Sequence, residues 1–219
     1  GGNRVYLIDR PIAQGDQTRE KKSGTPSADA RHPLGKLVAL NAANGRVVWT
    51  EDQDIYGTLL AVSVKHKTLL MCYQDWRFKL ASELGGRMTA FDTERGTRRW
   101  DIQGTFHTRP IINGRTIYIQ PGAWDLLTGQ KKDFKFARSY GCGIPAGSKH
   151  MLVFRSATLG YVDLLHSGGT KNYGGIRPGC WINTLPVGGL VLMPDATDRC
   201  TCSYLIKASI ALQPHGEQR

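Results

Sequence analysis

The chain has 219 residues, and its 29 Lys and Arg against 18 Asp and Glu give a formal net charge of +11 at neutral pH. Hydrophobic residues make up 40% of the chain, enough for a packed core, which excludes wholesale disorder. No apolar run approaches the roughly 20 residues that a membrane-spanning helix needs, and the 26 Gly argue against a mainly helical protein.

Short strand-like segments bounded by turn residues recur along the chain, whereas helical periodicity is almost absent. Segments this short and frequent predict an antiparallel, all-β protein. Residues 10–34 show no periodicity and predict a long surface loop, and the Gly-rich residues 166–179 leave no room for a regular strand. In chain order, the strands are expected at 4–8, 36–40, 46–49, 58–64, 68–73, 87–91, 116–119, 151–155, 160–164, 181–185, 190–193 and 209–212.

An internal repeat organises the first part of the chain. Residues 35–49 align with residues 86–100, and a reduced copy at 122–134 keeps the Asp and the Gly but lacks the final Trp. Each copy reads as a β-hairpin, and because an isolated hairpin is marginal in water, a tandem series is expected to bury its faces by stacking.

The second copy shows why these residue types recur at this spacing. An apolar strand ends at Asp92, whose carboxylate can bond the backbone of the following turn. Gly96 supplies a positive φ at low cost, and the next strand carries Trp100 to a packing surface. The corresponding residues of the first copy are Asn41, Gly45 and Trp49.

The pattern Ala-x-Asp-x-x-x-Gly-x-x-x-Trp resembles the tryptophan-docking repeat of pyrroloquinoline-quinone-type (PQQ-type) β-propellers, in which each Trp packs against the neighbouring blade. The resemblance implies an all-β propeller of four-stranded antiparallel blades. It covers nearly the whole chain after residue 35, with residues 138–214 resembling divergent, cysteine-containing terminal blades of larger bacterial proteins. Because a blade takes about 40–50 residues, we expect residues 1–219 to form one region of an incomplete ring, with the remainder on an amino-terminal segment.

Five cysteines bear on the redox compartment. Cys72 lies in an apolar strand and is expected to be a buried free thiol. Two disulfides are predicted among Cys142, Cys180, Cys200 and Cys202, with the pairing left open. Structural zinc is the alternative, although the Cys200-Thr-Cys202 spacing is tighter than the common zinc knuckle. Disulfides would favour a periplasmic or extracellular location.

A cluster of polar and aromatic residues among Gly-Gly pairs is the candidate ligand pocket. In a propeller the loops of one face line a central pocket, where Arg and Asn could hold an anionic ligand. The alternative is that Arg155 and Arg177 bond loop carbonyls while Trp181 packs a blade. The candidate pocket residues are Arg155, Asn172, Arg177, Trp181 and Asn183.

No hydrolase, metalloprotease or phosphate-loop motif is present, and the six His are isolated. We therefore expect no catalytic residues, no metal and no cofactor. The basic runs are broken by acids or turns, so the charge is expected on loops and strand faces rather than at a nucleic-acid interface.

These observations predict a non-catalytic, secreted or periplasmic β-propeller scaffold that presents a surface to a protein or carbohydrate partner. The resemblance implies an alternative, a fragment of a PQQ-dependent quinoprotein oxidoreductase of the alcohol or sugar dehydrogenase type. Such an enzyme would hold PQQ against Ca²⁺ bound by Glu, Asn and Asp, and the chain shows no convincing set of that kind.

Overall fold

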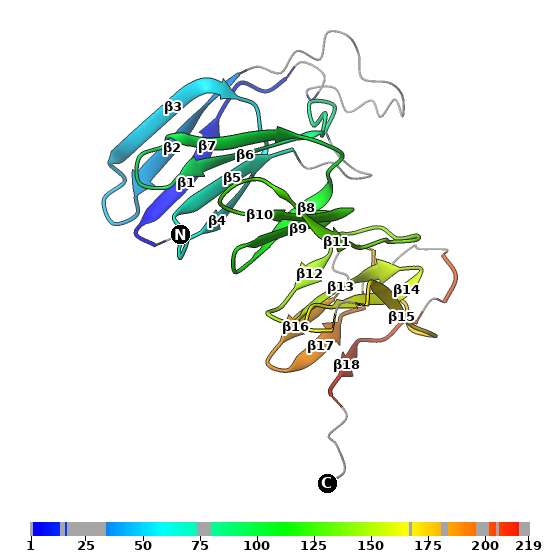
Figure 1. Cartoon of the computed structure of the whole chain (residues 1–219). Helices are drawn as coiled ribbons and strands as arrows, with labels where there is room; N and C mark the ends of the chain where they lie inside the picture. Colours follow the sequence, from blue (N-terminus) through cyan, green and yellow to red (C-terminus); the bar gives the residue numbers. More distant parts are fainter. Residues whose placement is uncertain are drawn as a thin grey trace. The chain divides into compact units, whose positions relative to one another are not determined.

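The computed structural model describes residues 2–13, 16, 34–73, 80–166, 168–180, 184–195, 202–204 and 206–214. In these residues the labelled elements are all β-strands, and they form five sheets of three or four strands (Figure 1). The all-β prediction is therefore confirmed. Within the same residues, we find no helix with the length and apolar character needed to cross a membrane.

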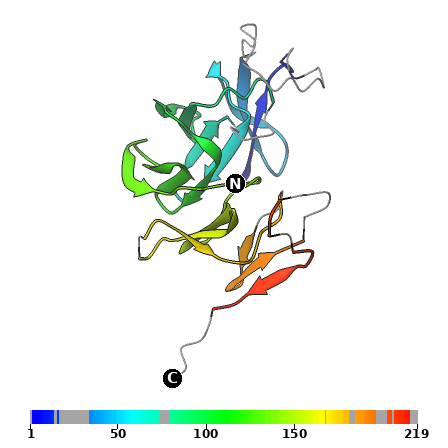
Figure 2. The ribbon, with the colours of Figure 1, turned by 90° about the vertical axis from the view of Figure 1, so that its right-hand side faces the viewer.

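The chain divides into two compact units. One comprises Gly1–Ile119 and Trp124–Lys132, and the other comprises Gln120–Ala123 and Asp133–Arg219. Figure 2 shows the ribbon from a second direction. The prediction of a single region over 1–219 stays a prediction.

Three sheets hold most of the first unit, and in each the strands follow one another as in the chain. The first sheet contains β1 (Arg4–Asp9), β2 (Gly35–Asn41) and β3 (Val47–Ile55). The second contains β4 (Leu59–Ser63), β5 (Thr68–Cys72), β6 (Arg87–Asp92) and β7 (Arg98–Gln103). The third contains β8 (His107–Asn113), β9 (Thr116–Gln120), β10 (Gly122–Asp125) and β11 (Lys131–Lys135), and the unit boundary passes through β9, β10 and β11.

Two sheets belong to the second unit. The fourth sheet contains β12 (Ala146–Gly147), β13 (Met151–Ser156), β14 (Thr158–Asp163) and β15 (Thr170–Tyr173). The fifth contains β16 (Leu185–Val187), β17 (Leu190–Met193) and β18 (Ile210–Leu212). Small sheets in which consecutive strands pair as neighbours are the blade unit of a β-propeller, the class that the repeat predicted.

The expectation that residues 166–179 hold no strand is wrong. β15 pairs antiparallel with β14, with Asn172 opposite Gly160. Its side chains are mostly exposed because β15 is an edge strand, so it lacks the alternation of apolar residues that marks a half-buried strand. Most of the predicted loop at 10–34, and residues 181–183 of the predicted strand at 181–185, lie outside the described residues.

The repeat turns of the second and third sheets are each closed by an aspartate. Asp92 Oδ1 accepts hydrogen bonds from the backbone amides of Glu94 and Arg95, at 2.8 and 3.0 Å. Asp125 Oδ1 accepts in the same way from residues 127 and 128, both at 3.0 Å. Burial would raise the pKa of Asp92, but hydrogen bonds from Arg99 and the two amides outweigh it and hold the pKa below its usual value.

Two tryptophans join successive sheets of the first unit. Trp49, on β3, donates its Nε1–H to the carbonyl of Thr93 at 2.9 Å and covers Gly96, where a Cβ would lie 2.7 Å from the ring. Trp100, on β7, donates to the carbonyl of Leu126 at 3.1 Å and covers Gly129, where a Cβ would lie 2.9 Å from the ring. We call the pairing of an indole with the following sheet's turn a tryptophan dock.

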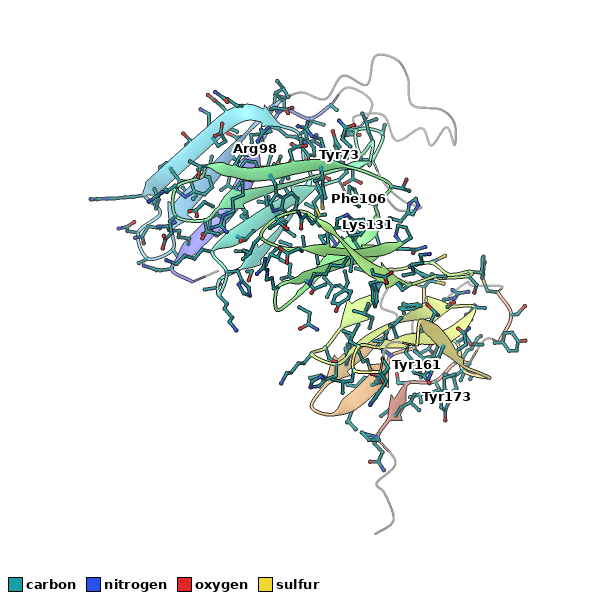
Figure 3. All side chains as sticks on the ribbon, viewed as in Figure 1. Tyr73, Arg98, Phe106, Lys131, Tyr161 and Tyr173 are labelled. Atoms are coloured by element: carbon teal, nitrogen blue, oxygen red, sulfur yellow. The ribbon has the colours of Figure 1, made fainter. Side chains whose placement is uncertain are left out.

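Apolar clusters fill the spaces beside these docks. One lies between the first and second sheets and includes Leu37 and Ile55 from the first and Leu69 and Met71 from the second. The other lies between the second and third sheets, where Phe106, labelled in Figure 3, packs edge-on against Trp124. The core residues of both clusters are almost completely buried.

Candidate functional site

The second unit holds a pocket whose walls are built on β13. The segment before β12 is joined to the end of β13 by two hydrogen bonds. The amide of Ser139 donates to Ser156 Oγ at 3.0 Å, and the amide of Ala157 donates to the carbonyl of Tyr140 at 2.5 Å. Ala157 has a φ of +61° at the tight turn between β13 and β14. These bonds fix the Tyr140 ring beside the end of β13.

Arg138 secures the loop that follows Tyr140. Its guanidinium donates to the carbonyls of Arg155, Gly141, Cys142 and Gly143 at distances from 2.8 to 3.0 Å. Burial lowers the pKa of this arginine to about 10. The alternative interpretation of the sequence expected Arg155 to donate to loop carbonyls. In the structure Arg138 makes these hydrogen bonds.

Arg155 is fully buried, with 0% of its surface exposed. Its Nη1 donates to Cys180 Sγ at 3.3 Å, its guanidinium carbon lies 5.3 Å from the centre of the Tyr140 ring, and its Nε has no hydrogen-bond partner among the described residues. Burial would lower the pKa of Arg155, but the neighbouring thiols of Cys202 and Cys180 outweigh it and hold the pKa above its usual value.

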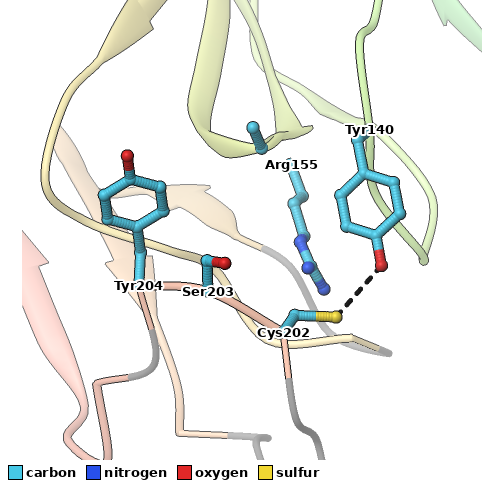
Figure 4. A pocket seen from close by; sticks show the side chains of 6 residues that line it. Tyr140, Arg155, Cys202, Ser203 and Tyr204 are labelled. Atoms are coloured by element: carbon cyan, nitrogen blue, oxygen red, sulfur yellow. Dashed lines mark hydrogen bonds between the residues drawn. The ribbon is translucent and has the colours of Figure 1, made fainter.

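Arg155 is one of the residues that line a cavity of about 360 Å³ (Figure 4). The hydroxyl of Tyr140 and the thiol of Cys202 are hydrogen-bonded at 3.1 Å across one side. Tyr140 and Tyr204 are 52% and 61% exposed, so they offer aromatic faces to solvent. The lining residues are Tyr140, Arg155, Ala157, Cys202, Ser203 and Tyr204.

A buried cation normally has a matching anion or a full set of hydrogen bonds. Arg155 has neither within the described part of the chain, since its side chain meets thiols and an aromatic ring and no carboxylate lines the cavity. Arg138 brings a second, half-buried positive charge close by, since its guanidinium donates to the carbonyl of Arg155. The arrangement can therefore attract a small anionic group, with a planar or apolar body held between the tyrosines.

The structure separates the residues of the sequence-predicted pocket. Arg155 lines the cavity, whereas Asn172 lies exposed on β15 and Arg177 is buried outside the cavity lining. Trp181 and Asn183 lie outside the described residues. Tyr140, Ser203 and Tyr204 were missed, and only the position of Tyr140 directly before the Gly141-Cys-Gly143 loop could have pointed to it.

The disulfide prediction is wrong for the described cysteines, because Cys142, Cys180 and Cys202 form no disulfide. Cys180 and Cys202 are engaged by Arg155 and Tyr140 instead of by each other. The support that disulfides gave to a periplasmic or extracellular location is thereby removed, and that location stays a prediction.

The remaining two cysteines are Cys72 and Cys200. Cys200 lies outside the described residues. Cys72 is a buried free thiol, as predicted, and burial raises its pKa to about 12.

The pocket does not fit the Ca²⁺ site that a quinoprotein enzyme would need. Ca²⁺ takes six to eight oxygen ligands, with carboxylates prominent among them. The described lining of the cavity contains no carboxylate, and nowhere in the described ranges do three His, Cys, Asp or Glu residues come together in a way that could hold a metal.

Comparisons with known proteins return structures alone. No family model matches the chain, and no curated protein matches it. BamB from Moraxella catarrhalis is 15% identical, with a TM-score of 0.49 over 86% of this chain and 57% of its own. The computationally designed Ika4 protein is 16% identical, with a TM-score of 0.46 over 70% of this chain and 88% of its own.

A third similar structure is the quinohemoprotein alcohol dehydrogenase ADHIIG from Pseudomonas putida HK5. It is 14% identical, with a TM-score of 0.46 over 83% of this chain and 40% of its own. This chain thus spans less than two thirds of both the BamB and the dehydrogenase structures.

Proposed function

We propose that the chain is a non-catalytic binding module on a β-propeller scaffold, and that its Arg155 pocket takes a carboxylate carried by a protein or carbohydrate partner. The observation that carries this proposal is the fully buried Arg155, which borders a cavity of about 360 Å³ lined without any carboxylate among the described residues. A guanidinium binds carboxylates through paired N–H donors, and burial strengthens such a bond because water competes less.

The rim of the cavity supports a ligand with a ring or a planar group next to its carboxylate. Tyr140 and Tyr204 present half-exposed aromatic faces, and Ser203 adds a hydroxyl that can donate or accept. An acidic sugar and an acidic peptide both carry the shared chemistry, so the assay must separate them.

Calorimetric titration of the whole chain tests the proposal. The probes are a galacturonate oligosaccharide, its methyl ester, an acidic peptide, and the same peptide with its carboxylates amidated. We expect binding of one acid form, at least tenfold tighter than its neutral counterpart. Equal binding of acid and neutral forms, or no binding of either acid, would contradict the proposal.

Variants locate the site. Tyr204→Ala removes an exposed ring, so it should leave the fold intact and weaken binding about tenfold, a loss typical of an aromatic contact at a binding site. Tyr173→Ala is the matched control, because it removes a similarly exposed ring, 51% exposed, that does not line the cavity. Equal losses in the two variants would contradict a site at the Arg155 pocket.

The non-catalytic part of the proposal has its own test. The chain is mixed with PQQ and Ca²⁺, and dye-linked oxidation of alcohols and sugars is followed by absorbance. We expect no turnover above the mixture without protein. Turnover that depends on the protein would favour the quinoprotein alternative.

A further inference from the structure

The Arg155 pocket contains a nucleophilic side chain that carboxylate binding does not use, the thiol of Cys202. Cys142 and Cys180 are half-buried like Cys202, but neither is among the residues that line the cavity. Cys202 differs from them because it borders a space of about 360 Å³. That volume lies at the lower end of the range of about 300–1,000 Å³ that is usual for small-molecule pockets.

Two polar groups meet the sulfur of Cys202. The hydroxyl of Tyr140 lies 3.1 Å from Sγ, and the guanidinium of Arg155, which points toward Cys202 in Figure 4, also hydrogen-bonds it. The hydrogen bond to Cys202 raises the pKa of Tyr140, so the hydroxyl keeps its proton and can donate to the sulfur. Reactive cysteines lie in electropositive, partly exposed surroundings, and the surroundings of Cys202 are of this kind.

Arg155 keeps donor capacity for a ligand next to this thiol. The residue is fully buried, its Nη1 donates to Cys180 Sγ at 3.3 Å, and its Nε has no hydrogen-bond partner among the described residues. No carboxylate among the described residues lines the cavity, and Arg138 adds a second positive charge nearby. A molecule that carries a sulfur and a carboxylate a few bonds apart would therefore meet Cys202 and Arg155 together.

The backbone beside Cys202 adopts an unusual conformation. Tyr204 has a φ of +60°, in the left-handed region that a bulky side chain rarely adopts. Strain of this kind is concentrated at binding sites. The ring of Tyr204 is 61% exposed and lines the same cavity as Cys202 and Ser203. Residues 202–204 thus present a thiol, a hydroxyl and an aromatic ring to one space.

We propose that Cys202 is a covalent modification site, at which a small disulfide bearing a carboxylate exchanges with the thiol and leaves its carboxylate-bearing half in the Arg155 pocket. This inference rests on the proposed function in one respect, because the same guanidinium binds the carboxylate. It adds a covalent bond and a class of ligand, small thiols that carry a carboxylate.

The step is thiol–disulfide exchange. Cys202 gives its thiol proton to solvent, and the thiolate attacks one sulfur of the incoming disulfide. A new S–S bond forms at Sγ while the S–S bond of the reagent breaks, and the second sulfur departs with the bonding pair and is protonated by solvent. Cys202 is thereby oxidised and the departing thiol is the reduced product, so the small disulfide is itself the oxidant. Arg155 holds the carboxylate and so keeps the reacting sulfurs close together.

The test compares dithiodipropionic acid with its dimethyl ester, which is the same disulfide without the charge. Both react with the folded Cys200→Ser chain, because Cys200 and Cys202 lie on one tryptic peptide between Arg199 and Lys207. Unreacted thiols are blocked with a maleimide at timed intervals, and the mixed disulfide at each cysteine is measured by mass. Arg155 stays in place, because replacing so buried a side chain would disturb the fold.

Cys142 is the matched control, a half-buried thiol of the same unit that does not line the cavity. We expect the ratio of the acid rate to the ester rate to be at least tenfold higher at Cys202 than at Cys142, because Arg155 binds the carboxylate of the reagent beside Cys202. The net charge of +11 affects both thiols, so the comparison removes its contribution. Equal ratios at the two cysteines would overturn the proposal.

A second readout locates the attached group. After full modification by the acid, binding of the galacturonate oligosaccharide and of the acidic peptide is measured again by calorimetry, before and after reduction with dithiothreitol. Whichever acid the unmodified chain binds should bind at least tenfold more weakly, and reduction should restore it. Unchanged binding would overturn the placement of the group in the pocket.

The outcomes separate this inference from the proposed function. Binding of an acid probe without a preference for the acid disulfide at Cys202 would overturn this inference alone. A preference for the acid disulfide at Cys202 without binding of either acid probe would support this inference and overturn the proposed function alone.

Discussion

Replacing Gly96 by Ala in the 219-residue chain tests whether the tryptophan docks hold the first unit together. A methyl group at this position would lie 2.7 Å from the Trp49 ring, too close for any carbon contact, so the indole must leave its place. Its Nε1 would then lose the Thr93 carbonyl, and its contact with Tyr6, at 5.9 Å between ring centres, would open. The substitution therefore breaks the dock from the receiving side and leaves Trp49 itself in the chain.

The magnitude follows from three contributions. An alanine in the left-handed region costs about 1–2 kcal/mol. The lost hydrogen bond adds about 1 kcal/mol, and the lost aromatic contact adds roughly 0.5–1.5 kcal/mol. We expect Gly96→Ala to lower the free energy of unfolding of the first unit by about 3–4 kcal/mol.

Gly45→Ala is the matched control because it carries the same backbone strain without a ring to displace. Its φ of +70° is close to the +76° of Gly96, and no described atom lies within 4 Å of the new methyl. It should cost only the strain, about 1–2 kcal/mol. Urea unfolding followed by tryptophan fluorescence and far-ultraviolet circular dichroism gives both values. Costs that agree within about 0.5 kcal/mol would refute the idea that docking contributes to stability.

Three further predictions concern acid stability, the pocket and the buried thiol. The folded chain holds the pKa of Asp92 below its usual value, so the unfolded chain takes up protons first and the free energy of unfolding should fall as the pH drops below about 4. Asp92→Asn should reduce this dependence of the free energy of unfolding on pH, measured by urea unfolding between pH 2 and 6. An unchanged dependence would contradict the role of Arg99. Gly141→Ala should weaken ligand binding in calorimetry and leave the far-ultraviolet circular dichroism spectrum nearly unchanged, because its Cβ would lie 2.7 Å from the Arg155 carbonyl and displace the pocket wall. Cys72, whose pKa burial raises to about 12, should react with iodoacetamide at pH 8 only after unfolding, and rapid labelling in the native chain would show that β5 is open.

The repeat hairpins could be predicted from sequence because their chemistry is local. An Asx residue, a glycine four positions later and a Trp eight positions later all serve one turn and one neighbouring sheet, so spacing alone reveals them. β15 could not be found in this way. It is an exposed edge strand, and its pairing depends on the backbone of β14 rather than on apolar side chains.

The pocket was only partly predictable because its members come from distant parts of the chain. Tyr140 and Cys202 are hydrogen-bonded although 62 positions separate them, and no spacing rule reports such a contact. The cysteines illustrate the same difficulty. Their Gly-rich surroundings favoured disulfides, whereas the decisive neighbour of Cys180 is the buried guanidinium of Arg155, which sequence alone could not place there.

Each tryptophan dock joins a sheet to the sheet that follows it in the chain, so the run of docks determines how many sheets can unfold together. The first sheet gives its indole to the second and the second gives its indole to the third, so the three sheets are coupled in sequence. The series ends at β11, where Asp133 occupies the position that Trp100 holds on β7, and Asp133 is also where the main stretch of the second unit begins. A single Trp-to-Asp difference in the repeat thus coincides with the limit of one cooperative block, and the two units are expected to melt as separate transitions.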